Sequence, residues 1–194
     1  MRFGRHMPTE SHAAQALRQL VSLGGDAMQL FVTNPRSWRA PTPNPLEEKA
    51  FRAVCAELND PAIVTHAAYL INLASPREDY FTQSVTLLRA TLDLTARLGG
   101  EAVVFHIGSH SGAGIDAGLS RLVDGIVQTL APATDTINDS DTTAPDGQPL
   151  LLLENDTGGG GKLGASFAHL AHALDALPQY ADRLGVCLDT AHLW

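Results

Sequence analysis

Four apolar runs of the chain each end in residues that could bind a metal ion. AIVTH ends at His66, AVVFH at His106 and LLLLE at Glu154, while GVCLDTAH carries Asp189 and His192. Neutral imidazole nitrogens and carboxylate oxygens are donors that zinc accepts in proteins. Each residue also has a structural alternative: a turn histidine, an ion-paired glutamate or a helix-capping aspartate. Four such coincidences at four run ends favour a shared metal site.

These residues follow runs that are typical of buried parallel strands. We predict strands over Arg2–His6, Ala27–Phe31, Ala62–His66, Ala102–His106, Leu150–Glu154 and Gly185–Leu188. Continuous apolar runs without alternation are expected where both faces of a sheet are covered. Parallel barrel strands present their C-terminal ends at one mouth. The residues that end these strands are therefore expected to meet there.

Amphipathic stretches between the strands predict helices, and hence repeated βα units. Asn44 and Ser75 each precede a proline and, three positions on, a glutamate, so both are predicted to begin helices as capping boxes. Apolar stripes predict further helices around Leu119–Leu130 and Phe167–Leu177. The fold class is therefore α/β, as a parallel barrel in a single domain over residues 1–194.

Two segments depart from this rhythm. Ala131–Pro149 contains four aspartates and almost nothing apolar, so we predict a disordered acidic loop on the side opposite the mouth. Gly158–Gly161 lacks the phosphate-loop pattern because Lys162 is followed by leucine. We expect this glycine run to be a mobile loop over the site.

Length and composition limit the class of protein. The 194 residues are enough for one buried core, but a complete eight-unit barrel typically needs about 250. A net charge of −8 argues mildly against a generic nucleic-acid binder, although bound cations would neutralise site carboxylates. The chain shows no apolar run of membrane-span length, no signal core and no CxxC, so a reducing cytoplasm is expected.

Together the motifs resemble the endonuclease IV family of zinc-dependent apurinic/apyrimidinic endonucleases, AP endonuclease family 2. The matching stretches, in the family's order, are MQLFVTNPRSW, THAAYLINLASP, VVFHIGSHSG, LLLENDTGGGGKLGASFAHL and RLGVCLDTAH. The resemblance implies a TIM barrel with three zinc ions at its mouth. It implies that His66 and His106 bind the first zinc and that Glu154, the catalytic carboxylate, bridges the first and second. Asp189 would bind the second zinc and His192 the third.

The resemblance also implies a substrate. The family cleaves double-stranded DNA 5′ to abasic sites with a zinc-activated hydroxide, leaving a 3′-hydroxyl and a 5′-deoxyribose phosphate. Arg36, Tyr69 and Leu70 match residues that probe the minor groove beside the lesion. Four further family ligands would follow Trp194, so we expect an incomplete barrel of about six βα units. Family members are usually monomers, but this chain is expected to cleave weakly or not at all and to need a complementing segment or self-association.

Two other functions remain open from the sequence. A metal-dependent sugar isomerase or epimerase with a related barrel would use similar mouth residues, although the NPRSW and AYLINLAS stretches favour the nuclease. A non-catalytic remnant that binds DNA or a partner is the other alternative, because an open barrel exposes unpaired edges and apolar core.

Overall fold

The computed structural model describes residues 1–8, 12–132 and 147–193. These residues form one sheet of six parallel strands whose spatial order is the chain order. The strands are β1 (Gly4–His6), β2 (Ala27–Phe31), β3 (Ala62–His66), β4 (Ala102–His106), β5 (Leu150–Glu154) and β6 (Leu184–Cys187). The helices between them are α1 (Ala13–Ser22), α2 (Pro45–Glu57), α3 (Glu78–Arg97), α4 (Ile115–Leu130) and α5 (Phe167–Asp175). This βα repetition confirms the predicted α/β, TIM-barrel-like class.

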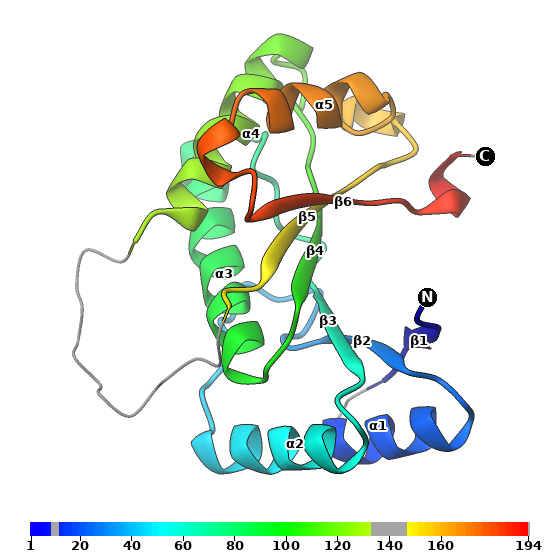
Figure 1. Ribbon diagram of the computed structural model, residues 1–194. Helices are drawn as coiled ribbons and strands as arrows, with labels where there is room; N and C mark the ends of the chain where they lie inside the picture. Colours follow the sequence, from blue (N-terminus) through cyan, green and yellow to red (C-terminus); the bar gives the residue numbers. More distant parts are fainter. Residues whose placement is uncertain (9–11, 133–146, 194) are drawn as a thin grey trace.

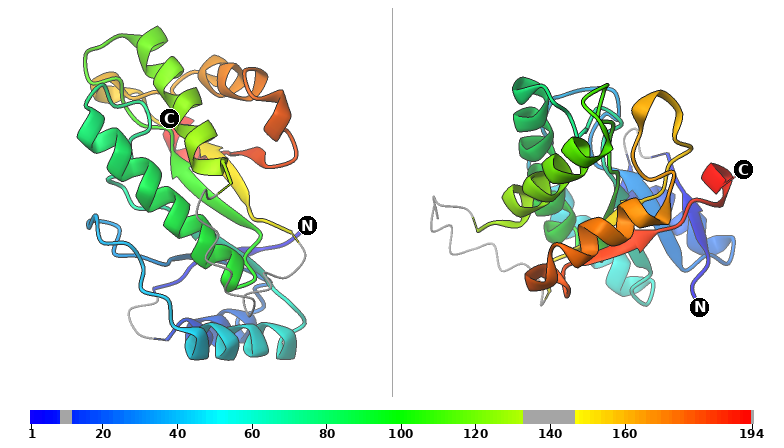
Figure 2. Two further views of the ribbon diagram at one scale, coloured as in Figure 1. Left: turned by 90° about the vertical axis from the view of Figure 1, so that its left-hand side faces the viewer. Right: turned by 90° about the horizontal axis from the view of Figure 1, so that it is seen from above.

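The five helices lie on the outer side of a curved sheet (Figures 1 and 2). The four middle predicted strands have the predicted bounds, while β1 begins two residues later and β6 lies one residue earlier than predicted. Strands β1 and β6 lie at the two edges of the sheet, and each has a single neighbouring strand within the described residues. Among the described residues, no helix is long and apolar enough to cross a membrane.

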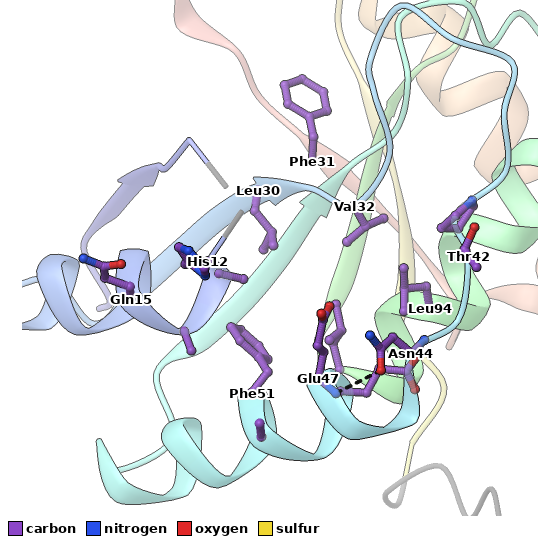
Figure 3. Close-up of a pocket in the computed structure, with 16 residues that line it drawn as sticks. His12, Gln15, Leu30, Phe31, Val32, Thr42, Asn44, Glu47, Phe51 and Leu94 are labelled. Atoms are coloured by element: carbon purple, nitrogen blue, oxygen red, sulfur yellow. Dashed lines mark hydrogen bonds between the residues drawn. The ribbon is translucent and has the colours of Figure 1, made fainter. Parts of the chain in front are cut away.

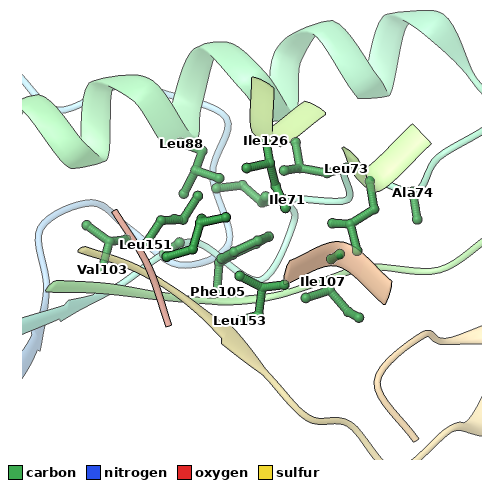
Figure 4. Packing of buried hydrophobic residues seen from close by; sticks show 14 of the residues in the cluster. Ile71, Leu73, Ala74, Leu88, Val103, Phe105, Ile107, Ile126, Leu151 and Leu153 are labelled. Atoms are coloured by element: carbon green, nitrogen blue, oxygen red, sulfur yellow. The ribbon is translucent and has the colours of Figure 1, made fainter. Parts of the chain in front are cut away.

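Two apolar cores attach the helices to the sheet. The larger core lies between β4, β5 and helices α3 to α5, with Phe105, Leu153, Leu88 and Ile126 among its fully buried members (Figure 4). The smaller core joins α1 and α2 to β2 and β3 through residues that include Leu17 and Phe51. Strands β4 and β5 are thus held rigidly from their outer side.

The two-residue period of a strand decides where the candidate ligands point. Val103 and Phe105 of β4 face the outer core, so Val104 and His106 face the inner side. The same alternation places Glu154 on the inner side, two residues after Leu152. The inner face forms an open hollow of about 410 Å³ lined by Val64, Val104, Leu152 and Val186, among others. The strand-end histidines and glutamate therefore stand at the mouth of this hollow.

The helix-start predictions succeeded once and failed once. Asn44 caps α2 by accepting a hydrogen bond from the Glu47 amide, but the reciprocal bond from the Asn44 amide goes to Glu48 instead of Glu47. Ser75 does not cap α3, which begins at Glu78. Its hydroxyl accepts from the Arg77 amide instead, closing a tight turn before the helix. The predicted acidic loop falls largely on residues 133–146, which lie outside the described residues.

Candidate metal centre

His66, His106 and Glu154 meet at the mouth, as their strand-end positions predict. His66 Nε2 lies 3.1 Å from Glu154 Oε2, and His106 Nε2 lies 3.5 Å from the same oxygen. His106 and Glu154 are direct partners in the β4–β5 register, whereas His66 ends the next strand over. Zinc bonds of about 2.1 Å in a tetrahedron separate neighbouring donor atoms by roughly 3.4 Å. The two distances to Glu154 therefore suit donors of one zinc ion, and one ligand atom from each of the three residues lies within 4.8 Å of the others.

Hydrogen bonding fixes the proton position on His66. Its Nδ1 lies 2.8 Å from the carbonyl oxygen of Ala67, which can only accept, so Nδ1 carries the proton. A neutral His66 then presents the lone pair of Nε2 to the carboxylate of Glu154. Two acceptors at 3.1 Å require a proton or a cation between them. The His66 and Glu154 side chains are 9% and 7% exposed, so bulk water cannot screen this contact.

His106 is held in its neutral form. Burial lowers its pKa, although the neighbouring Glu154 carboxylate acts in the opposite direction. Its Nδ1 is buried and makes no hydrogen bond of good geometry with any described residue. Oδ2 of Asp156 lies 3.4 Å from this nitrogen. A carboxylate behind a histidine is the arrangement that orients metal-binding imidazoles.

Asp156 is itself tightly held. Burial acts to raise its pKa, but hydrogen bonds from Lys162 and Thr157 outweigh burial and lower the pKa. Lys162 Nζ lies 2.9 Å from Oδ1, and both the amide and the hydroxyl of Thr157 donate to that oxygen. Oδ2 stays directed toward His106 as a carboxylate oxygen.

A second group shares Glu154 and adds Asp189 and His192. One donor atom from each of these three residues lies within 4.8 Å of the others. His192 Nδ1 donates to the carbonyl of Asn155 at 2.8 Å, which leaves Nε2 as a lone-pair donor facing Asp189 Oδ2 at 3.4 Å. Asp189 Oδ1 also accepts from the Ala191 amide, so the helix-cap alternative and the ligand alternative use different oxygens of one carboxylate.

The donor set fits zinc on chemical grounds. Two histidines have their second ring nitrogen tied to a backbone carbonyl, and the third has a carboxylate behind it. Each imidazole therefore directs its other ring nitrogen toward a carboxylate, buried Glu154 for His66 and His106 and partly exposed Asp189 for His192. This is the arrangement of zinc sites with outer hydrogen-bond support. The first group supplies three protein donors, one fewer than tetrahedral zinc takes.

Comparison with known proteins now identifies the family. The family model for the xylose isomerase-like TIM barrel matches residues 17–194. The chain belongs to this family. Its relatives confirm the predicted membership in the endonuclease IV group, AP endonuclease family 2.

Two relatives show the extent of the match. The chain is 35% identical over 193 residues to the protein named probable endonuclease 4 of Chloroflexus aurantiacus, covering 100% of this chain and 64% of that protein. It is 39% identical over 191 residues to that of Halorhodospira halophila, covering 97% of this chain and 60% of that protein. The chain thus spans under two thirds of the length of these relatives.

Solved structures agree. Endonuclease IV from Thermus thermophilus superposes with a TM-score of 0.76 at 33% identity, over 99% of this chain and 64% of that one. A D-tagatose 3-epimerase-like protein superposes with a TM-score of 0.70 at 17% identity, over 98% of this chain and 66% of that one. The epimerase match reflects the shared fold alone.

In this endonuclease IV-like chain, the residues predicted to contact DNA lie on two adjacent loops. Arg36 is exposed on the loop after β2, and Tyr69, 55% exposed, and the half-buried Leu70 follow β3. The Tyr69 amide donates to the carbonyl of Pro35 at 2.9 Å, which joins the two loops. The Tyr69 ring lies 5.8 Å from the His66 ring, so this surface borders the candidate metal centre.

His6, which ends β1, and the glycine run Gly158–Gly161 lie outside the two ligand groups. His6 donates from Nδ1 to the side chain of Gln29 and stacks against Phe31. The end of the glycine run contacts the loop after β4: Gly161 accepts from the His110 amide, and Lys162 pairs with Ser109 in an antiparallel bridge. Lys162 also bonds Asp156, so this loop supports the site from behind.

Three residues near the centre were not predicted. Phe31 packs its ring against His6, His66 and Tyr69 and fills the mouth between β1 and β3. Asn155 and Asp156 are 1% and 5% exposed, and both contact candidate ligands. Their signal was available in the sequence, because polar residues that follow a buried LLLLE run need partners.

A cavity of about 620 Å³ lies elsewhere, between α1, α2 and the end of β2 (Figure 3). Its walls are mainly apolar, with Asn44 and Glu47 at one side. As far as the described residues define it, none of the five candidate ligands lines this cavity. The candidate ligands therefore gather at the mouth and not in this cavity.

Proposed function

We propose that this chain carries the zinc-binding part of a DNA-repair endonuclease that cuts DNA 5′ to abasic sites. His66, His106 and Glu154 bind one zinc ion, and Asp189 and His192 bind further zinc together with Glu154. The observation that carries this proposal is the convergence of the Nε2 atoms of His66 and His106 on one buried carboxylate oxygen of Glu154, at 3.1 and 3.5 Å. Membership in the endonuclease IV family supports the same conclusion.

The residues divide the work between holding and orienting. Bound zinc would supply Lewis acidity toward a phosphate oxygen and lower the pKa of a coordinated water. The Ala67 carbonyl keeps His66 in the tautomer that offers Nε2. Glu154 belongs to both ligand groups and therefore joins them into one cluster. Burial lowers the pKa of His106, so its imidazole stays neutral and available.

The loops that neighbour the candidate metal centre support DNA as the substrate. The exposed Arg36 can contact the phosphates of double-stranded DNA. The Tyr69 ring and the apolar Leu70 side chain can occupy the space left by the missing base. These residues border the metal centre and are joined through the Pro35 carbonyl. Cleavage would leave a 3′-hydroxyl and a 5′-deoxyribose phosphate.

We propose that full endonuclease activity requires the longer chain length of the relatives. The chain spans 60–64% of the two relatives compared, and its outer strands β1 and β6 each have one neighbour in the described part. We expect weak cleavage or none by the 194-residue chain alone, and completion by a complementing segment or by self-association.

The test compares two DNA duplexes that differ by one abasic-site analogue. Zinc-loaded chain should bind the damaged duplex more tightly, and Arg36→Ala with Tyr69→Ala should remove this preference. Arg18→Ala is the matched control, because Arg18 is paired with Glu57 on the outer helices. Equal affinity for both duplexes, with or without zinc, would contradict the proposal.

Any strand cleavage gives a second readout. The cut should fall on the 5′ side of the lesion and disappear in Glu154→Gln. Ketose epimerisation by zinc- or manganese-loaded chain, without a preference for damaged DNA, would favour the epimerase alternative instead. Damage-specific binding with no cut in any completed form would favour the non-catalytic alternative.

A further inference from the structure

Asn155 stands where the β5–β6 pairing ends. The last register pair of the two strands is Glu154 with Cys187, and the Asn155 amide reaches back to the Cys187 carbonyl at 3.4 Å. Beyond this point the chain after β6 turns away into a short 3₁₀ segment, Thr190–Leu193. Backbone pairing alone therefore does not fix Asp189 and His192.

The Asn155 side chain continues the pairing. Its Oδ1 accepts from the Asp189 amide at 2.7 Å, and its Nδ2 donates to the Asp189 carbonyl at 3.0 Å. The carboxamide thus replaces a peptide group of the ladder and brackets both backbone groups of one residue. The Asn155 backbone carbonyl also accepts from His192 Nδ1 at 2.8 Å. One residue consequently fixes both members of the Asp189–His192 pair.

We propose that Asn155 is a positioning residue that holds the Asp189–His192 pair against Glu154 for metal binding. The inference rests on the proposed zinc function. Glu154 directly precedes Asn155, so the bracket sets the distance between the shared carboxylate and the two outer ligands. Asn155 is 1% exposed, and its bonds to Asp189 are protected from competing water.

The outer ligands need this support more than the inner ones do. Asp189 and His192 have side chains 34% and 22% exposed, and β6 has only β5 as a neighbour in the described part of the sheet. Without these hydrogen bonds, the turn that carries Asp189 and His192 would lose conformational entropy when the metal binds, and this loss would lower the affinity. Because Asn155 already orders the turn in the folded chain, this entropy is not lost on metal binding, and the affinity is higher.

The chain contains a matched control for this bracket. Asn72 makes the same two bonds to the backbone of Ser109, accepting from its amide at 2.9 Å and donating to its carbonyl at 3.0 Å. That bracket joins the loops after β3 and β4. Asn72→Ala removes the same kind of support from a loop that carries none of the five candidate ligands.

The experiment is a zinc titration of the full 194-residue chain, monitored through the ring ¹⁵N chemical shifts of His66, His106 and His192. The midpoint for each ring is the zinc concentration at which half of its shift change has occurred. In the unsubstituted chain all three rings should respond. In Asn155→Ala the midpoint for His192 should rise roughly 10- to 100-fold, while those of His66 and His106 stay unchanged. Asn72→Ala should lower the melting temperature without moving any of the three midpoints.

Asn155→Asp separates positioning from charge. The substitution keeps the size of the side chain and the acceptor for the Asp189 amide, but places an oxygen against the Asp189 carbonyl. Added negative charge alone would strengthen cation binding, whereas positioning predicts a weaker His192 response. An unchanged or tighter His192 midpoint in both variants overturns the inference and leaves the zinc function intact. No response from any of the three rings in the unsubstituted chain overturns both.

Discussion

The two ligand groups share Glu154, but different structural elements position their other residues. His66, His106 and Glu154 end β3, β4 and β5, and each of these strands has a neighbour on both sides. Asp189 and His192 follow β6, which has one neighbour in the described residues; Asp189 lies just before the 3₁₀ segment Thr190–Leu193, and His192 lies on it. The inner group is therefore positioned by the sheet itself. In the outer group, the Asn155 side chain holds Asp189 and the Asn155 backbone carbonyl holds His192.

This difference has consequences for the electrostatics. The inner histidine–glutamate contact is almost fully buried, so it lies in a medium where charge interactions are strong. The outer aspartate–histidine contact is partly exposed and more strongly screened by water. We therefore expect the inner group to take zinc first and more tightly.

Glu154→Gln should have the largest effect, because it removes the carboxylate that both groups use while keeping the side-chain shape. Zinc binding should weaken at both groups by more than the roughly 10- to 100-fold that loss of an outer partner costs. Competition with a chromophoric chelator measures this loss. Retention of one tight zinc per chain would show that the two groups are independent of Glu154.

His66→Gln should remove the inner group and spare the outer one. The substitution takes away one of three donors at a buried site, so the tight zinc should be lost. The ring signal of His192 should still respond to zinc at higher concentration. Loss of both responses together would mean that the inner ion is needed to assemble the outer group.

Asp189→Asn should produce the reverse result. The amide keeps an oxygen for the bond from the Ala191 amide, so the turn is preserved while the charge is removed. Zinc binding at His66 and His106 should be unchanged, and the His192 response should weaken. Weakening of the inner group by a similar factor would break the proposed distinction.

Asp156→Asn should have the smallest effect of the series. Asp156 touches His106 from behind at 3.4 Å and does not belong to either ligand group. We expect a loss of about 10-fold in affinity at the inner group, with the outer group unaffected. Asp175→Asn, at the exposed end of α5, provides the control for a changed charge.

The fold and the inner group could be predicted because burial is visible in the sequence. Strands covered on both faces require continuous apolar runs, so a histidine or glutamate at the end of AVVF or LLLL marks both the strand end and the mouth. Strand period and barrel geometry then bring residues 88 positions apart, such as His66 and Glu154, into contact.

Support from Asn155 and Asp156 could not be predicted in the same way. Asn155 bonds Asp189, 34 residues away, and that partner is known only once β5 and β6 are placed side by side. The failed cap at Ser75 has a related cause, because a hydroxyl can close a local turn as readily as it caps a helix. Local polar residues have several possible partners, and tertiary structure selects among them.

X-ray absorption at the zinc edge of chain loaded with one equivalent of zinc tests the central claim most directly. If His66, His106 and Glu154 bind the first zinc, the spectrum should show two imidazole nitrogens and carboxylate or water oxygens at about 2.0–2.2 Å, with no sulfur. His66→Gln should remove one imidazole from this shell. A zinc–sulfur distance of about 2.3 Å, from Cys55 or Cys187, or a shell without histidine, would contradict it.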